Sequence, residues 1–304
     1  MGALIQQLTV LYIFIIIGFY LGKKRPDSAK NSGILSFVLV NVFFPAKIFL
    51  NFSGNFTVDY LKNNYISLFI GIGLLFLMLV LGAPVALLLG RNRYEKKVYV
   101  YSTAVSNYAY LGYVLVGEAL GNEAMNNLMT FCIPISIYCN TVGIAMLMDK
   151  KINLKNLFQP VTVAMFIGIA WGLLKLPVPE IAKTVLDSAG KCMGPTSMVL
   201  VGMVLSGFSF RQLLPNWQSW VFCAVRLLIV PAMVYGVCMA VKVFIPLPDA
   251  VYPSAVIMAA MPCGLNPVVY PKMIGQDCSL GAKLIPLTSI LSMATIPLWL
   301  WIIM

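Results

Sequence analysis

The stretch Met261-Pro262-Cys263-Gly264-Leu265-Asn266-Pro267 interrupts a long run of apolar residues with two prolines and a glycine. Proline removes a backbone donor and clashes with the preceding helical turn, so a continuous helix is not expected here. The surrounding residues, about 250–272, are apolar enough to cross a membrane. An interrupted helix inside a bilayer leaves backbone groups free, which is tolerated only beside protein or a wet cavity. The stretch therefore predicts a broken transmembrane helix at the edge of a cavity.

The composition of the whole chain is that of a membrane protein. Of its 304 residues, 60% are hydrophobic and 10% are charged, against roughly 45–50% and about 25% in soluble domains. About 20 residues of helix cross a hydrocarbon layer of ~30 Å. The apolar runs predict ten transmembrane helices in an all-α protein, at about 3–22, 31–52, 64–90, 98–119, 125–148, 158–175, 180–208, 216–244, 250–272 and 280–304.

The net charge of +11 is distributed over short loops between these runs. Assigning the loops alternately to two sides places 14 lysines and arginines on one side and 4 on the other, namely Lys62, Lys175, Lys183 and Lys242. Cytoplasmic loops carry the excess of basic residues, so we expect both termini outside the cytoplasm and the protein in the cell membrane. This pattern argues against a nucleic-acid partner. The first apolar run precedes its basic cluster, so we expect it to be retained and not cleaved as a signal peptide.

Ten helices divide into two units of five, at 1–154 and 155–304. Because five is odd, the two units must enter the membrane in opposite senses. A shift of 154 residues places Gly18 on Gly172 and Gly121 on Gly275. We therefore expect two inverted five-helix repeats, a recurring plan in secondary transporters.

The fourth predicted helix carries a second polar interruption about halfway along, at Ser106-Asn107-Tyr108. In inverted-repeat transporters the substrate binds near the midplane, where a helix of each half is broken and half-helix N-termini attract anions. The alternative for both segments is a kinked packing helix, since Pro and Gly are common in membrane helices. The predicted substrate-binding residues are Ser106, Asn107, Tyr108, Pro262, Cys263, Gly264 and Asn266.

Three polar residues inside other helices are candidates for lining the cavity or for gating: Asn41, Asn140 and Arg226. A charge at the centre of a membrane helix costs about 2.5–3.5 kcal/mol, so Arg226 needs a partner or water. A structural role is the alternative for Arg226, and hydrogen bonds between helices are the alternative for both asparagines.

The sequence predicts neither a metal site, nor a cofactor, nor an enzyme. It contains no histidine, and none of its seven cysteines forms a CxxC pair, whereas zinc sites use Cys and His at close spacing. No HExxH motif, pair of buried aspartates or nucleophile with a base is present. No carboxylate falls near a helix midpoint, so proton coupling has little support.

These motifs resemble, in their order, those of the auxin efflux carrier family, which includes bacterial relatives and the plant PIN auxin carriers. Met261–Asn266 with Gly275-Gln276-Asp277 resembles the family's ninth helix and the following turn. The tail Thr288–Pro297 resembles its last helix, Asn107 with Gly112 and Gly121 its fourth, and Phe44-Pro45-Ala46 its second.

The resemblance implies a PIN-like (NhaA-like) fold of two inverted five-helix repeats, whose interrupted helices four and nine cross at the centre. Asn107 and Asn266 would flank that crossing and hold a substrate carboxylate. Helices three to five and eight to ten would move, elevator-like, against a scaffold of one, two, six and seven, and the scaffold would pair two protomers. Tyr113 and Ala109 stand where proline and glycine are common in relatives, which predicts a gentler break in helix four.

The expected function is transport of a small organic anion by alternating access. A sodium-coupled organic anion symporter of the bile-acid type, with a similar ten-helix plan, is an alternative. A channel or receptor is a further one.

Overall fold

The computed structural model describes residues 2–24, 28–207, 216–244, 249–276 and 278–303. The predicted segment ends at 208 and 304, and Asp277 of the turn motif, lie outside these residues. The described part of the chain is helical, with short 3-10 and π-helical turns and no strand. It forms two compact units, Met1–Leu68 with Leu154–Gly207 and Phe69–Asn153 with Phe208–Met304. Each unit takes residues from both predicted halves, 1–154 and 155–304, and the halves themselves stay a prediction.

The first unit is built from pairs of helices that approach closely. Its elements are α1 (Gly2–Lys24), α2 (Ser28–Val38), the π-turn η1 (Leu39–Phe43), α3 (Phe44–Asn55), the first turns of α4 (Val58–Leu89), η4 (Leu154–Phe158), α8 (Pro160–Leu173) and α9 (Glu180–Ser206). Helix α1 packs along α9, and α3 packs along α8. A Cβ on Gly18 would lie 2.1 Å from the carbonyl oxygen of Val199, so this contact requires glycine.

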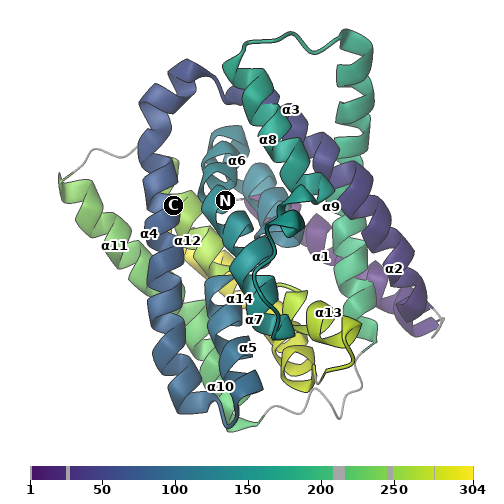
Figure 1. Cartoon of the computed structure of the whole chain (residues 1–304), viewed down its shortest axis with the longest axis vertical. Coiled ribbons are helices and arrows are strands. Elements are labelled where there is room, and N and C mark those ends of the chain that lie inside the picture. The colour runs from purple at the N-terminus through teal and green to yellow at the C-terminus, as the bar shows by residue number, and fades with distance from the viewer. Residues whose placement is uncertain (1, 25–27, 208–215, 245–248, 277, 304) are drawn as a thin grey trace. The chain divides into compact units, whose positions relative to one another are not determined.

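The second unit surrounds a short, mostly apolar helix, α12 (Val251–Ala260). Its elements are the rest of α4, α5 (Arg93–Ala104), η2 (Tyr108–Gly112), α6 (Tyr113–Tyr138), η3 (Cys139–Gly143), α7 (Ile144–Met148), α10 (Trp217–Ala224), η5 (Val225–Ile229), α11 (Val230–Phe244), α12 (Val251–Ala260), α13 (Asn266–Met273) and α14 (Ser279–Ile303). Helix α12 packs against α6, α11 and α14 (Figure 1). Eight of its ten residues are buried, so α12 is the core of this unit.

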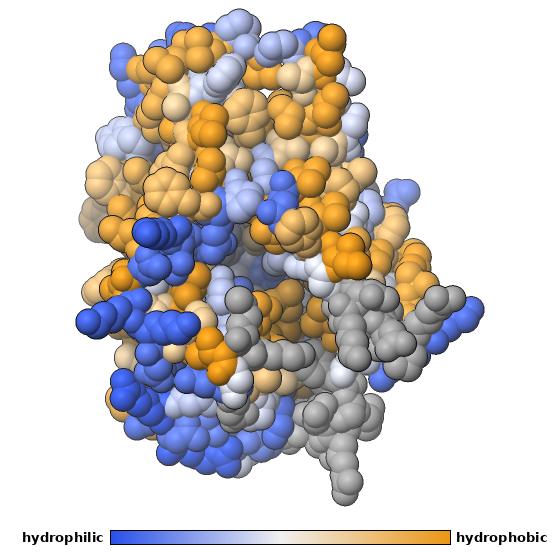
Figure 2. Space-filling model, turned by 45° about the vertical axis from the view of Figure 1, so that its right-hand side comes forward, coloured by the Kyte–Doolittle hydropathy of each residue, from blue (hydrophilic) through white to orange (hydrophobic). Residues whose placement is uncertain are grey.

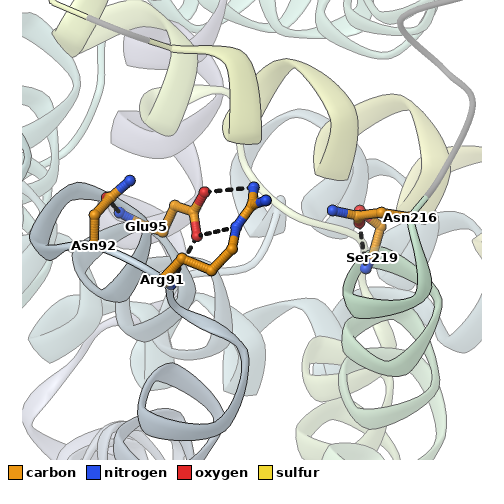
Figure 3. Close-up of polar contacts among 5 residues, drawn as sticks. All are labelled: Arg91, Asn92, Glu95, Asn216 and Ser219. Carbon is orange, nitrogen blue, oxygen red and sulfur yellow. Dashed lines mark hydrogen bonds and ion pairs between the residues drawn. The ribbon is translucent and has the colours of Figure 1, made fainter.

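Local capping explains where two of these helices begin. The Asn92 side chain accepts a hydrogen bond from the Glu95 backbone N–H at 2.9 Å, and the Glu95 carboxylate accepts from the Arg91 backbone N–H at 2.8 Å. Asn216 caps α10 in the same way, accepting from the Ser219 N–H at 3.0 Å (Figure 3). Such caps satisfy backbone donors that have no partner within the helix. The predicted fourth helix therefore begins at Arg93 and not at residue 98.

Five helical stretches of the described residues are long and apolar enough to cross a membrane: Gly33–Asn55, Asn64–Leu89, Tyr108–Met148, Trp217–Phe244 and Ser279–Ile303. Helices α8 and α12 are shorter and also apolar. Large apolar side chains cover much of the surface in view (Figure 2). Phe76 and Leu88, for example, are 68% and 78% exposed. A patch of this kind is stable in contact with lipid chains, as expected of a multi-pass membrane protein.

Two glycines mark equivalent places along the chain. Gly121 and Gly275 have φ angles of +85° and +68°. They are 154 residues apart, the shift that aligns the two predicted halves. Gly121 follows the first turns of the helix after the break at 105–107, and Gly275 follows α13 after the break at 261–265.

Candidate functional site

Both predicted interruptions are present, and both lie in the second unit. Helix α5 ends at Ala104, Val105 is extended (φ −115°, ψ 109°), and helical structure resumes at Tyr108. Helix α12 ends at Ala260, and Met261 is extended (φ −63°, ψ 147°) before α13 begins at Asn266. The break in the fourth predicted helix is the shorter of the two and is followed directly by a π-turn.

The two unwound segments meet and pair through their backbones, and we call the place where they meet the crossing. Ser106 and Cys263 form an antiparallel bridge, and the Asn107 N–H donates to the Pro262 carbonyl at 2.8 Å. A Cβ on Gly264 would lie 3.4 Å from the Ser106 carbonyl oxygen, so the two backbones are in close contact. The breaks therefore satisfy part of each other's freed hydrogen-bonding groups, as burial in a membrane requires.

Asn266 lies at the start of α13 with its amide held by two other elements. Its Nδ2 donates to the Tyr101 hydroxyl of α5 at 2.6 Å and contacts the Cys139 Sγ of η3 at 3.1 Å. The Tyr101 hydroxyl and the Cys139 thiol are themselves 2.9 Å apart. Residues from two distant parts of the sequence thus fix the orientation of this amide.

Asn107 differs, because the oxygen of its side chain has no partner. The residue is only 4% exposed, and its Oδ1 is buried without a hydrogen bond. The Ser102 hydroxyl is in the same condition. Leaving such a group unsatisfied costs about 1–3 kcal/mol, so native proteins rarely do so without a reason. Next to Asn107, the Tyr108 hydroxyl bonds the Ser136 hydroxyl at 2.9 Å and is thereby satisfied.

Cys263 is held by residues of α14 and α5. Its backbone N–H donates to the Thr288 hydroxyl of α14 at 3.2 Å, and that hydroxyl donates to the Leu284 carbonyl at 2.7 Å. The Cys263 thiol lies 3.9 Å from the Ser102 carbonyl oxygen. Thr288 therefore anchors the broken segment to α14.

Arg226 lies in the π-turn η5, where it is completely buried. Its Nη1 donates to the carbonyl of Ala259 near the end of α12. Its Nε and Nη2 are buried without a partner. The neighbouring Leu227 carbonyl accepts from the Trp299 indole at 2.8 Å, which anchors the turn to α14.

Asn41 and Asn140, the two other residues predicted to line the cavity, lie in different units of the structure. Asn41 belongs to the first unit, is exposed, and donates to the Phe37 carbonyl of its own helix at 2.8 Å. Asn140 is half-buried in η3, directly after Cys139. The structure thus gives Asn41 a local role and places Asn140 next in sequence to a residue that contacts Asn266.

An open pocket of about 430 Å³ lies at the beginning of α5. Lys97 and Arg93 both pair with Asp149, the latter at 3.5 Å. The hydrogen bond from Lys97 lowers the pKa of the Asp149 carboxyl. Helix α5 has 12 residues, so the crossing lies roughly 18 Å away along it. The pocket lining is Asn92, Arg93, Lys96, Lys97, Val100 and Met146.

Sequence reasoning missed Tyr101, Ser102, Cys139 and Thr288. Thr288 carried a signal, because it opens the tail motif that resembles the last helix of the auxin carriers. The others are ordinary members of apolar runs. Among the residues that the structure describes, no three His, Cys, Asp or Glu side chains gather as metal ligands would.

Comparison with known proteins gave two results. The model of the membrane transport protein family, that of the auxin efflux carriers, matches residues 3–151 and 140–300. A protein of Methanothermobacter thermautotrophicus described as an uncharacterized transporter is 24% identical over 315 aligned positions, which cover 98% of each chain.

Proposed function

The chain belongs to the membrane transport protein family, the auxin efflux carriers, and is a membrane transporter and not an enzyme; on that basis we propose that it carries a small organic anion with a carboxylate group across the cell membrane by alternating access. The observation that supports this most is the crossing of two interrupted helices at Ser106 and Cys263. Asn107 and Asn266 stand where helical structure resumes after each break.

The chemistry of the crossing suits an anion. The helices that resume after Asn107 and from Asn266 present their N-terminal ends there, and such ends carry partial positive charge. Amide side chains can donate hydrogen bonds to a carboxylate without the cost of burying a full charge, and Asn266 would share with it the N–H groups that now point to Tyr101 and Cys139. The three cationic side chains of the α5 pocket would raise the local concentration of anions on their side of the membrane.

We propose further that the fold consists of ten transmembrane helices in two inverted repeats. The two ranges matched by the family model, 3–151 and 140–300, correspond approximately to the two predicted halves, with an overlap at 140–151. Gly121 and Gly275 share a positive φ at equivalent positions. Gly18 and Gly172, also 154 residues apart, both meet backbone atoms of another helix closely, at 2.1 Å and 2.7 Å from an ideal Cβ.

The proposed transport cycle moves the second unit relative to the first. The second unit contains the predicted third to fifth and eighth to tenth helices together with the whole crossing, and the first contains the remaining helices. This division matches the moving and scaffold parts that the resemblance implied, and it supports an elevator-like motion. The scaffold would pair two protomers, and both termini would lie outside the cytoplasm.

A sodium-coupled symporter of the bile-acid type is the rival within the same class. Uptake into proteoliposomes with sodium replaced by choline separates the two. Unchanged uptake supports the sodium-independent carrier, and a loss of uptake supports the rival. Saturable counterflow of labelled substrate would argue against a channel.

The site is tested by thermal stabilisation of the purified protein with monocarboxylates, dicarboxylates and indole acids. We expect at least one of these anions to raise the melting temperature. Asn107→Ala and Asn266→Ala should weaken the apparent affinity by on the order of 10- to 100-fold, since hydrogen bonds to charged groups contribute about 1.5–3 kcal/mol. Asn55→Ala is the matched control, because the Asn55 side chain is exposed and donates to Asn51 of its own helix. An anion that keeps its full effect in both variants would show that the site is elsewhere.

A further inference from the structure

Arg226 carries a buried positive charge for which the described part of the molecule offers no counter-charge. It takes no part in the ion pairs of the described residues, which join Arg91 to Glu95, Arg93 and Lys97 to Asp149, Lys175 to Asp59, Lys191 to Asp187 and Lys242 to Asp249. Its only hydrogen bond there goes to the neutral carbonyl of Ala259. The elements packed against η5 are α10, α11, α12 and α14.

This arrangement is costly unless a further partner completes it. Removing a charge from water costs several kcal/mol even after relaxation, and one neutral carbonyl does not offset that. Arginine cannot escape the cost by losing its proton, because its guanidinium stays charged in proteins. A fully buried Arg226 with two unsatisfied N–H groups therefore points to an acceptor that arrives from elsewhere.

The free nitrogens also indicate the shape of that acceptor. Nη1 is used by Ala259, whereas Nε and Nη2 are free. Nε and Nη2 share one edge of the planar guanidinium, where their N–H bonds form a fork. This fork matches the two oxygens of a carboxylate.

The position of Arg226 connects it to the crossing. Ala259 is the last residue but one of α12, immediately before the interruption. Four residues after Ala259, Cys263 pairs with Ser106 across the crossing. The Cys263 thiol lies 3.9 Å from the carbonyl oxygen of Ser102, whose hydroxyl is likewise buried and without a partner.

We propose that Arg226 supplies the fixed positive charge of the anion site and receives the substrate carboxylate on its Nε and Nη2 edge. This assignment rests on the proposed function and adds to it that the substrate carries a negative charge that pairs with Arg226. Among the described residues, Arg226 is the permanent cation bonded next to the crossing, so a monocarboxylate bound to it forms a neutral pair. A purely structural Arg226 would account for the bond to Ala259 and would leave the free edge unexplained.

The test uses the full-length purified protein with acetate and malonate as probes, and reads the apparent affinity from the concentration dependence of the melting temperature. Arg226→Gln keeps two N–H donors and removes the charge, so the affinity should fall by on the order of 10- to 100-fold. Lys191→Gln is the control, because it also removes one positive charge, from a side chain that is 76% exposed and lies outside the site and the α5 pocket. Its affinity should stay within about twofold of the wild type.

A lysine at position 226 should make the affinity for carboxylates depend on pH, which a purely structural role of this residue would not do. A buried lysine loses its proton well below its ordinary pKa of about 10.4. The affinity of Arg226→Lys should therefore fall about tenfold per pH unit above the pKa of the new side chain, whereas the wild type should be flat between about pH 6 and 9. Because Cys263 is the described titratable group that interacts with Arg226, the profile is repeated with Cys263→Ser.

The outcomes separate the two proposals. If no carboxylate stabilises the wild type, the proposed function fails and the role of Arg226 fails with it. If carboxylates stabilise the wild type and Arg226→Gln equally, only the assignment of Arg226 is overturned. If Arg226→Gln does not fold, the lysine variant decides, and a flat pH profile for Arg226→Lys overturns the assignment.

Discussion

Asn266 and Asn107 occupy similar places after their breaks, yet their amides are in different states. The Asn266 amide donates to Tyr101 and Cys139, whereas the Asn107 oxygen is buried without a partner. A side chain that is already oriented loses little entropy when a ligand arrives. We therefore regard Tyr101 as a positioning residue for the carboxylate site.

Replacing Tyr101 with phenylalanine removes the acceptor of the Asn266 amide and keeps the ring. The free energy of unfolding should fall by about 1–3 kcal/mol, because a buried amide N–H loses its partner. The apparent affinity for the stabilising carboxylate should fall by roughly threefold or more, because the amide is no longer held. Melting temperatures with and without malonate measure both effects.

Tyr99→Phe is the control for this variant. Tyr99 is two residues earlier in α5, is also buried, and packs its ring on Phe222. It should leave the affinity unchanged. Equal affinities in Tyr101→Phe and Tyr99→Phe would remove Tyr101 from the site.

The difference between Asn266 and Tyr101 also shows what a single sequence can predict. Asn266 stands beside Pro267 and follows Gly264, so local chemistry marks it as part of a break. Tyr101 lies in an unbroken helix, and its partner is 165 residues away. Nothing local to residue 101 indicates which face of its helix meets another segment. Contacts of this kind depend on tertiary packing, which periodicity does not encode.

Breaks in helices were predictable, whereas the pairing of the breaks was not. Pro262 and Pro267 cannot continue a helix, so the interruption of 250–272 follows from covalent chemistry. That the two broken segments meet was expected only from the resemblance to a family, and the pairing of Cys263 with Ser106 was not predicted. The start of α5 was missed because its first turns, Arg93 to Lys97, are charged and fall outside an apolar run. The Asn92–Glu95 capping box was present in the sequence and would have placed that start.

The turns after the two broken helices give a prediction on backbone conformation. Gly121 (φ +85°, ψ 180°) and Gly275 (φ +68°) adopt conformations that L residues disfavour, and a Cβ at either would meet nothing within 4 Å. Gly121→Ala and Gly275→Ala should each lower the free energy of unfolding by about 1–3 kcal/mol through strain alone. Thermal unfolding in detergent measures this.

Gly73→Ala is the control for the turn variants. Gly73 lies within α4, and a Cβ there also meets nothing within 4 Å. Since alanine is the better helix former, this variant should be neutral or up to about 1 kcal/mol more stable. If all three alanine variants behaved alike, positive φ would not be what these turns require.

The charge distribution of the whole chain determines how it is expected to lie in the membrane. The basic α5 pocket and Lys150 and Lys151 belong to the side with 14 lysines and arginines, whereas Lys183 belongs to the side with 4. Cytoplasmic loops hold the excess. An anion carrier oriented in this way presents its basic pocket to anions inside the cell, where electrostatic attraction speeds their arrival.

Lys151→Cys and Lys183→Cys test this orientation, since both lysines are exposed. Each is introduced into a protein with Cys192→Ser and Cys278→Ser, because Cys192 is exposed, Cys278 is half-buried and the other cysteines are buried. A membrane-impermeant maleimide should label residue 183 in right-side-out vesicles and residue 151 only in inside-out vesicles. The parent without either new cysteine should stay unlabelled in both. Labelling of residue 151 from outside would reverse the assignment. Labelling of both residues from one side would mean an even number of crossings between them, against the single crossing expected at 158–175.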